Sequence, residues 1–331
     1  MRAESNEHDV SFRGSLRVGK HSVNFFSEND DPVDHSELKN PSAFRIPGWK
    51  FDETLSESEY SIIYRHDEKS SLDLNLEEKS LTARGKPQDF ENGQALAFLA
   101  FWLTERQRQE QSAYTIYSAA LAIDGNGALL LGPSGAGKTS VLLKLCQMAN
   151  CEVVSNNLTL VSHNPESHQI NLDDGTKDIR PRLAAVNDFP ELKDILTSKL
   201  GNVSWETQVN ITPGEAGATI ADGPRPLSHV FEIHYDIRGQ DGLITKRENG
   251  LDVRYRLNEN MSRILRGTAI SVFGKDNHFL GYMPSLDTAD LYERRVKTIE
   301  TMVNDIGVMS ISGGNLLKLA EVVYSTITKK D

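Results

Sequence analysis

Cysteine is scarce in this sequence: Cys146 and Cys151 are the only two in 331 residues. Two thiols can build neither a disulfide framework nor a four-thiolate zinc site. No group of His, Cys and Asp residues has the spacing of zinc ligands either. We therefore expect reduced cysteines in an intracellular protein.

Long apolar runs are also missing. A membrane-spanning helix needs about eighteen or more consecutive apolar residues, and the best candidate, residues 114–131, is interrupted by Asp124, Asn126 and two glycines. The first residues, MRAESNEHDVSF, lack the apolar core of a secretion signal. The sequence predicts a soluble, cytoplasmic protein without a membrane partner.

Basic residues are in deficit. Lys and Arg number 36 against 47 Asp and Glu, which gives a net charge of −11. Such a surface repels polyanions, so we expect no nucleic-acid partner. Apolar residues make up 38% and charged residues 25%, an ordinary globular mixture. At about 150 residues per domain, the length predicts two domains.

Residues 1–112 are expected to form a small β-rich N-terminal module that ends in a helix. Alternating apolar residues predict strands at 15–26, 60–64 and 72–76. A helical spacing of apolar residues predicts a helix at 90–111.

Residues 113–331 alternate between strand and helix patterns, which predicts an α/β domain. A tight turn is expected at Asp124-Gly125 or Asn126-Gly127, and Asp173-Asp174 before Gly175 also predicts a turn. A helix face carrying Arg263 and Arg266 is expected within 258–267. The other expected strands are 114–124, 128–132, 151–155, 158–162 and 228–235, and the other expected helices are 138–148, 288–303 and 314–327.

The strongest motif is GPSGAGKT at residues 132–139, a phosphate-binding loop. Glycines let successive N–H groups turn inward toward phosphate oxygens, and the following helix adds its positive dipole end. Lys138 is expected to contact the β- and γ-phosphates, and Thr139 to offer a hydroxyl to Mg²⁺. The expected nucleotide contacts are Gly132, Ser134, Gly135, Ala136, Gly137, Lys138, Thr139 and Ser140.

Other classes of nucleotide-binding protein fit less well. A transporter ATPase would carry Ser-Gly-Gly before an acidic strand, but ISGGN at 311–315 is followed by LLKLAEVVYS. This element is expected to be a loop that starts a helix. A GTPase would carry a base-recognition element such as Asn-Lys-x-Asp, which the sequence lacks. No apolar strand ending in Asp stands where most ATPases of this kind place one.

The segments YSAALAIDGNGALLLGPSGAGKTSVLLKL and CEVVSNNLTLV resemble the HPr kinase/phosphorylase superfamily, over roughly residues 114–237. The resemblance implies a mixed sheet of the phosphoenolpyruvate-carboxykinase type. The family carries Ser-Asp-Asp where this chain has Ser155-Asn156-Asn157, and Glu-Ile-Arg where it has Asp178-Ile179-Arg180. An arginine precedes the later apolar strand in the family, and Arg225 does so here.

The resemblance implies catalytic roles for Lys138, Asn156 and Arg225, and metal binding by Thr139, Asn157 and Asp178. The first Asp of the family's pair acts as a general base, but an amide cannot accept a proton at neutral pH. Asn156 could still orient an acceptor, since a base contributes about 10²–10⁴-fold and positioning dominates phosphoryl transfer. Arg225 is the expected transition-state arginine. A family histidine falls on Tyr117, which could equally be a core aromatic.

The sequence thus predicts a kinase-like phosphotransferase that uses ATP, or GTP, with Mg²⁺ and acts on a hydroxyl of a small molecule or peptide, such as a serine. The resemblance adds a specialised biosynthetic pathway and a homo-oligomer as expectations. Two alternatives stay open: a regulatory nucleotide-binding protein that has lost catalysis, and an ATP-consuming ligase that activates a carboxylate.

Overall fold

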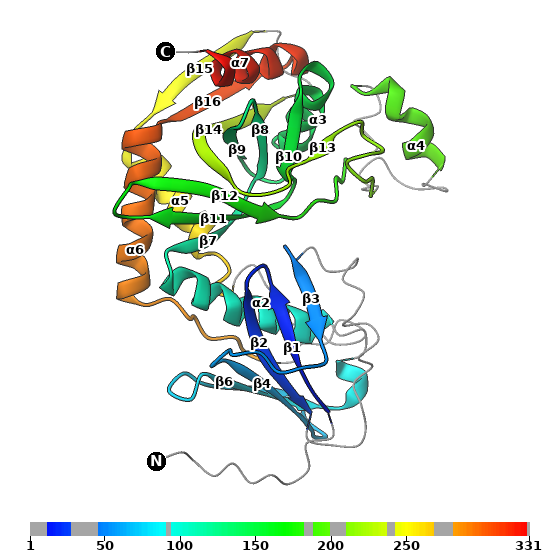
Figure 1. Ribbon diagram of the computed structural model, residues 1–331, viewed down its shortest axis with the longest axis vertical. Coiled ribbons are helices and arrows are strands. Elements are labelled where there is room, and N and C mark those ends of the chain that lie inside the picture. Colours follow the sequence, from blue (N-terminus) through cyan, green and yellow to red (C-terminus); the bar gives the residue numbers. More distant parts are fainter. Residues whose placement is uncertain are drawn as a thin grey trace. The chain divides into compact units, whose positions relative to one another are not determined.

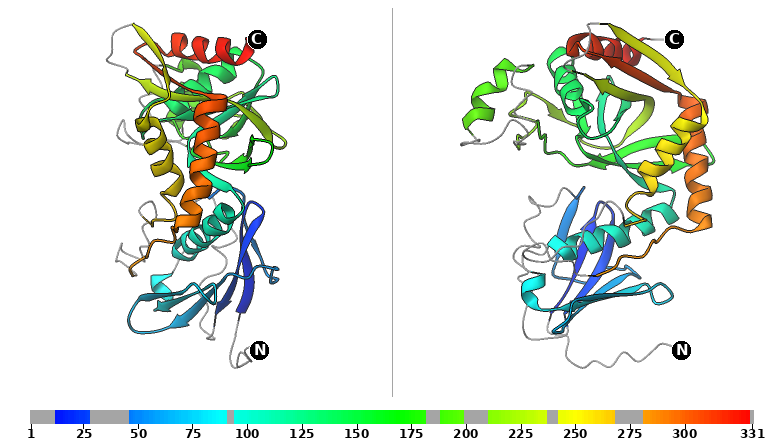
Figure 2. Two further views of the ribbon diagram at one scale, coloured as in Figure 1. Left: turned by 90° about the vertical axis from the view of Figure 1, so that its left-hand side faces the viewer. Right: turned by 180° about the vertical axis from the view of Figure 1, so that it is seen from behind.

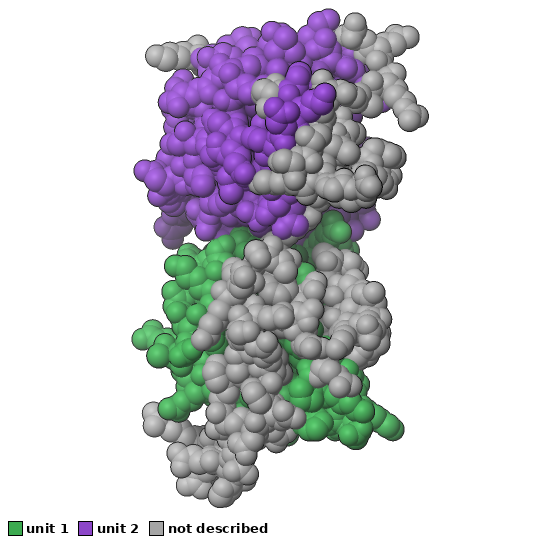
Figure 3. Space-filling model, turned by 90° about the vertical axis from the view of Figure 1, so that its right-hand side faces the viewer, with its two compact units in different colours: residues 1–111, 262–289 green, residues 112–261, 290–331 purple. Residues whose placement is uncertain are grey.

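The computed structural model describes residues 12–27, 46–90, 94–181, 188–198, 210–236, 242–267 and 281–329. The chain divides into two compact units, which Figure 3 colours separately. The first comprises residues 1–111 and 262–289, and the second comprises 112–261 and 290–331. Helices and mixed sheets occur together, so the α/β class is confirmed. Among the described residues, no helix has the length and apolar character to cross a membrane.

The first unit contains a 6-stranded mixed sheet in the order β3-β1-β2-β4-β6-β5 (Figure 1). The strand expected at 15–26 is a hairpin of two strands, because Gly19 adopts a φ of 60° between them. Alternate residues of the second strand of that hairpin are buried, as in a half-buried sheet. The strands are β1 (Phe12–Val18), β2 (His21–Ser27), β3 (Trp49–Asp52), β4 (Ser61–His66), β5 (Ser71–Asn75) and β6 (Ser80–Gly85).

Helix α2 (Gln94–Glu110) follows this sheet and contributes most of its apolar residues to the core. A short 3-10 turn, η2 (Pro87–Asp89), precedes it, so the helix starts later than the sequence pattern indicates. The Trp102 indole N–H donates to the Leu265 carbonyl at 3.3 Å. Arg106 Nη1 donates to the Leu286 carbonyl at 3.0 Å. These contacts tie residues 262–289 to the first unit, although the sequence pattern assigned them to the second domain.

The second unit is built on a 10-stranded mixed sheet with the main order β13-β10-β8-β9-β14-β12-β11-β7. Strand β16 joins β14 in parallel, and β15 joins β16 antiparallel. Strand β14 also runs parallel to β9. The strands are β7 (Ala113–Tyr117), β8 (Ala119–Ile123), β9 (Asn126–Leu131), β10 (Cys151–Ser155), β11 (Leu158–Asn164), β12 (Gln169–Gly175), β13 (Thr219–Ile220), β14 (Arg225–Tyr235), β15 (Leu243–Glu248) and β16 (Val308–Gly313).

Two hydrophobic cores lie on opposite faces of the central strands. In β9, Ala128 and Leu130 belong to the core with helices α3 (Lys138–Met148) and α7 (Leu316–Thr328). Leu129 and Leu131 belong to the core with α5 (Leu251–Ser262) and α6 (Ala289–Glu300). This alternation is the period-2 burial of a strand covered on both faces. Figure 2 shows α3 and α7 together on one face of the central strands.

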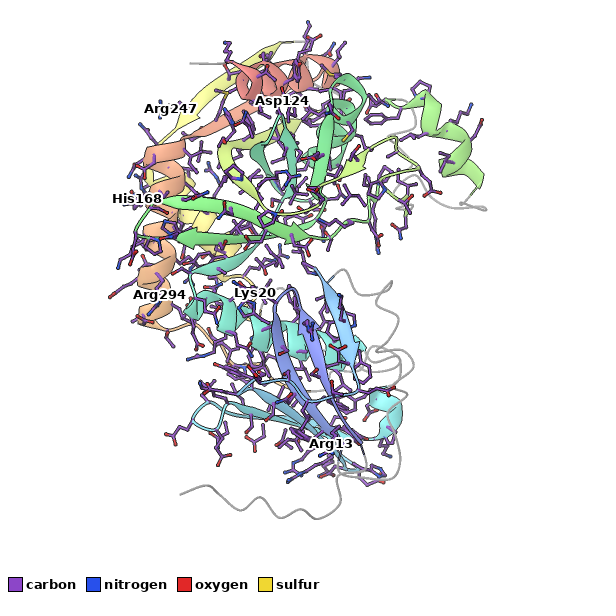
Figure 4. The ribbon with its side chains drawn as sticks, in the orientation of Figure 1. Arg13, Lys20, Asp124, His168, Arg247 and Arg294 are labelled. Carbon is purple, nitrogen blue, oxygen red and sulfur yellow. The ribbon has the colours of Figure 1, made fainter. Side chains whose placement is uncertain are left out.

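The central hairpin turns at Asp124-Gly125, one of the two expected places. Ile123 pairs with Asn126, and the two turn residues have φ of 50° and 81°. Both positive values are typical of the two-residue turn that matches strand twist. Figure 4 labels Asp124 on this turn. The stretch expected as one strand, 114–124, is divided at Ser118 into β7 and β8, and β8 ends at Ile123.

Some expected elements differ in the structure. The turn predicted at Asp173-Asp174 is wrong, because both residues lie in β12, where Asp174 pairs with Leu160 of β11 and Asp173 falls at an irregularity in the register. Helix α5 ends at Ser262, so Arg263 and Arg266 follow the helix. Helix α6 continues into a π-helical segment, η6 (Thr301–Ile306). Ile311 belongs to β16, and Asn315 caps α7 by accepting from the Lys318 N–H at 3.1 Å. A short helix, α4 (Lys193–Ser198), preceded by the 3-10 turn η4 (Pro190–Leu192), completes the described elements.

Candidate functional site

The glycine-rich loop joins the buried strand β9 to helix α3, as the sequence motif requires. Gly135 and Gly137 have φ of 86° and 89°, whereas Ala136 between them does not have a positive φ. Residues that alternate between positive and negative φ can turn consecutive N–H groups to one side of a chain, the arrangement that binds anions. Gly137 is also the N-cap of α3, so the dipole end of that helix adjoins the loop.

Strand β14 fixes the loop from beside it. The Tyr235 N–H donates to the Ala136 carbonyl at 2.9 Å. A Cβ on Gly137 would lie 2.5 Å from the Tyr235 Cβ, and one on Gly132 would lie 2.8 Å from the Ile233 carbonyl oxygen. Both positions therefore need glycine for space as well as for backbone conformation.

Lys138 is buried at the start of α3. Its Nζ donates to the Gly132 carbonyl at 2.7 Å and to the Pro133 carbonyl at 2.9 Å. The same atom lies 4.3 Å from the centroid of the Tyr117 ring. Burial lowers the pKa of Lys138 to about 8. The ammonium is thus placed on the glycine-rich loop, in contact with two of the loop's carbonyls.

Thr139 and Asn156 come together from different elements. Thr139 is the second residue of α3, and Asn156 directly follows β10. The Thr139 hydroxyl donates to Asn156 Oδ1 at 2.9 Å, and Asn156 Nδ2 donates to the Asp178 carbonyl at 3.2 Å. Strands β9 and β10 are both antiparallel to β8, so their carboxyl ends meet at one edge of the sheet. This edge carries the loop and the asparagine.

The two other expected metal ligands are placed less directly. Asn157 is held through its backbone: its N–H donates to Thr176 Oγ1 at 3.1 Å, and its carbonyl accepts from the Ser118 N–H at 3.1 Å. The Asp178 carboxylate is half-exposed and accepts from Asn210 Nδ2 at 3.4 Å. Asp178 contacts Asn156 by its carbonyl, which leaves its carboxylate out of that hydrogen bond.

The oxygen ligands of this site suit Mg²⁺. Mg²⁺ prefers oxygen ligands and is held in nucleotide sites mostly by phosphates and water, with few protein groups. The Thr139 hydroxyl and the Asn156 amide oxygen, 2.9 Å apart, supply that kind of group. Within the described ranges, no group of three or more His, Cys, Asp or Glu residues could hold a metal by itself. The residues present therefore fit a metal that arrives with a nucleotide.

Arg225 is the expected site residue that the structure does not bring to the loop. It is the first residue of β14, whereas Glu232 pairs in register with Leu131, the last residue of β9 before the loop. Arg225 lies seven positions before Glu232, which is about 23 Å along a strand at about 3.3 Å per residue. Arg225 instead forms a two-bonded ion pair with Glu152, at 2.8 and 3.0 Å, and a bond with Asp222 at 2.7 Å. These contacts hold Arg225 away from the loop in this structure, and a role as transition-state arginine stays a prediction.

Three residues near the glycine-rich loop, Glu232, Tyr235 and Asp188, were not identified as site residues from the sequence. Glu232 is a buried acid on the parallel neighbour of β9, paired with Arg256 at 2.7 Å. The Tyr235 hydroxyl donates to Asp188 at 3.1 Å, and burial raises the pKa of Asp188. The apolar pattern around Glu232 could have marked it as a strand acid beside the loop, but nothing local relates Asp188 to Tyr235. Arg180 and Arg182 flank Pro181 and are candidate phosphate contacts from the sequence, and Arg182 lies outside the described residues.

Comparisons with known proteins add little to this geometry. No family model matches the sequence, and no curated protein matches it. Among solved structures, the chain is similar to the Hpr(Ser) kinase/phosphatase from Coxiella burnetii. That similarity has 14% sequence identity and a TM-score of 0.25, and it covers 41% of this chain and 78% of the other. A TM-score this low carries no argument about the site or its activity.

Proposed function

We propose that the second unit binds a nucleoside triphosphate with Mg²⁺ on residues 132–139 and transfers phosphate to a hydroxyl of a small molecule or peptide. One observation carries the proposal. A glycine loop with alternating backbone conformations stands at the carboxyl end of a buried strand, and Lys138, Thr139 and Asn156 meet there.

Each residue has a task that follows from its position. Loop N–H groups and the first turn of α3 bind the phosphate chain. Lys138 supplies a positive charge to it, and Thr139 with Asn156 offers oxygens to the metal. Bound Mg²⁺ would neutralise charge on the phosphates. Asn156 orients the acceptor hydroxyl, because phosphoryl transfer depends mainly on positioning and charge neutralisation.

The test compares wild type with Lys138→Ala, using Lys144→Ala as the matched control. Lys144 lies on the same helix, is half-buried and bonds to Gln147. Each variant is incubated with ATP or GTP, Mg²⁺, serine peptides and small hydroxy compounds, and products are identified by mass spectrometry. We expect nucleoside diphosphate and a phosphoester from wild type and Lys144→Ala, and neither from Lys138→Ala. Product yields from Lys138→Ala equal to those from wild type and Lys144→Ala would contradict the assignment of the loop.

A second function is favoured by one specific observation. Asn156 uses its oxygen for Thr139 and its nitrogen for the Asp178 carbonyl, so it holds the site together without any group that could accept a proton. A regulatory protein that binds nucleotide and leaves it intact would need these hydrogen bonds but no proton acceptor. Tight Mg²⁺-nucleotide binding with complete recovery of the triphosphate would favour this alternative. An amide or acyl phosphate product would instead indicate a ligase.

The cytoplasmic location, the biosynthetic role and a homo-oligomer stay predictions. Light scattering on the purified full chain, with and without Mg²⁺-ATP, tests the last of these. A monomer under both conditions would contradict it.

A further inference from the structure

Lys138 points back onto its own loop. Two of its hydrogen bonds end on the Gly132 and Pro133 carbonyls, at 2.7 and 2.9 Å. A lysine in contact with phosphate oxygens would direct those donors outward. The ammonium must therefore leave at least part of this arrangement when a phosphate chain enters.

The Tyr117 ring covers the lysine in this position, with Nζ 4.3 Å from the ring centroid. The ring's place is set by both backbone groups of Tyr117. Its N–H donates to Asn260 Oδ1 at 2.8 Å, and its carbonyl accepts from Asn260 Nδ2 at 3.1 Å. Asn260 lies on α5, so a single amide side chain anchors the end of β7 under the loop.

The contact between the Lys138 ammonium and the Tyr117 ring is a cation–π interaction, which becomes stronger when it is buried. An ammonium over an aromatic face is held more strongly when water is excluded, and Lys138 is buried at 6% exposure. Leucine at position 117 would keep an apolar neighbour but lose the ring face. Phenylalanine would keep the face and lose only the hydroxyl.

We infer that Tyr117 is a positioning residue that retains Lys138 on the Gly132 and Pro133 carbonyls and thereby weakens binding of nucleotide polyphosphates. The inference rests on the proposed nucleotide-binding function. An entering phosphate competes with the Tyr117 ring for the Lys138 ammonium. The free energy needed to break the contact with the ring therefore reduces the affinity for the nucleotide. Asn260 acts indirectly, by holding the Tyr117 backbone in place through two hydrogen bonds.

Two measurements test this at pH 6.5, where the lysine is charged. The first is NMR of the Lys138 side chain in the full chain, assigned by loss of the signal in Lys138→Arg. An aromatic ring shifts protons above its face to lower frequency, so wild type and Tyr117→Phe should show a shifted Lys138 methylene signal that Tyr117→Leu lacks. The second is calorimetric binding of Mg²⁺-ATP and of inorganic tripolyphosphate to the same variants.

We expect Tyr117→Leu to bind both ligands about 2- to 30-fold more tightly than wild type, and Tyr117→Phe to match wild type. Weaker or unchanged binding by folded Tyr117→Leu would overturn the inference. Wild type provides a further readout if the leucine variant does not fold, because tripolyphosphate should abolish the ring-current shift. Persistence of that shift in the bound protein would also overturn the inference. If wild type binds no polyphosphate, the proposed function fails. If wild type and Tyr117→Leu show the same ring-current shift of the Lys138 methylene signal, the Tyr117 ring does not retain Lys138, and the inference fails independently of the proposed function.

Discussion

The Thr139 hydroxyl donates a hydrogen bond of 2.9 Å to Asn156 Oδ1. The Nδ2 of the same side chain donates to the Asp178 carbonyl at 3.2 Å. Asn156 thus acts as acceptor and donor at once, and an aspartate, which only accepts when ionised, could make just one of these bonds. The amide of Asn156 is therefore needed for both hydrogen bonds, and it also leaves the site without a carboxylate that could accept a proton at this position.

Asn156→Asp should therefore destabilise the protein in the absence of ligand. Its carboxylate would face the Asp178 carbonyl without a donor, and such unmade bonds cost about 1–3 kcal/mol in the free energy of unfolding. Urea unfolding measures this. Asn157→Asp is the matched control and should change stability little, because the bonds of Asn157 use its backbone. Equal losses for both variants would show that the Asn156 amide is not the cause.

Gly137→Ala should cost more stability than Gly125→Ala. Both glycines have positive φ, 89° and 81°, so each alanine carries backbone strain of about 1–2 kcal/mol. The new Cβ at 137 would also lie 2.5 Å from the Tyr235 Cβ, whereas at 125 it would meet nothing within 4 Å. Chemical unfolding of the two variants isolates this steric difference, which we expect to exceed about 1 kcal/mol. A smaller loss at 137 than at 125 would contradict the close packing of the loop on β14.

Arg225→Met should lower stability by about 1 kcal/mol and leave nucleotide affinity unchanged. The substitution removes the two-bonded partner of Glu152, a charge-assisted contact at the edge of the sheet away from the loop. Thermal unfolding and Mg²⁺-ATP titration check the two parts. A double-mutant cycle with Glu152→Met assigns the loss to the pair. Loss of nucleotide binding in a fully folded variant would return Arg225 to the site.

Nucleotide affinity should fall above about pH 8. Burial lowers the pKa of Lys138 to about 8, so at higher pH the free protein holds a neutral amine, and phosphate binding must take up a proton. The dissociation constant should rise by at most about tenfold per pH unit in that range. Titration calorimetry from pH 6.5 to 9.5 tests the effect. In Lys138→Arg, which stays charged, any remaining affinity should not decline in the same way.

Stability should also decrease in acid through His21. Burial, together with the nearby charge of Arg108, lowers the pKa of His21 from 6.5 to about 4 in the folded chain. Between these values the unfolded chain binds the extra proton, so the free energy of unfolding rises with pH. About 3 kcal/mol is present above pH 6.5 and lost as the pH falls toward 4. Urea unfolding from pH 4 to 7 measures this, and His21→Gln should show a flatter profile. Parallel profiles for the two proteins would exclude His21 as the cause.

Local patterns predicted much of the second unit. The helix expected at 138–148 is α3, and the strand expected at 151–155 is β10, because both have regular apolar spacing and clear turn residues at their ends. The turn at Asp173-Asp174 was mispredicted because pairing with β11 overrides the turn preference of aspartate. The sequence pattern placed residues 262–289 in the second domain, because the contacts of Leu265 and Leu286 with α2 join parts of the chain far apart in sequence and leave no local signal.

The sequence by itself determined the glycine-rich loop and the chemistry of its side chains, since eight consecutive residues carry the glycines, the lysine and the hydroxyl. Only the tertiary structure decided which distant residues join it. Strand direction places Asn156 at the loop's edge of the sheet and Arg225 at the other end of its strand. The same packing brings Tyr117 over Lys138 and Asn260 behind Tyr117. Local composition cannot encode these contacts, because they depend on how strands pair and which way each one runs.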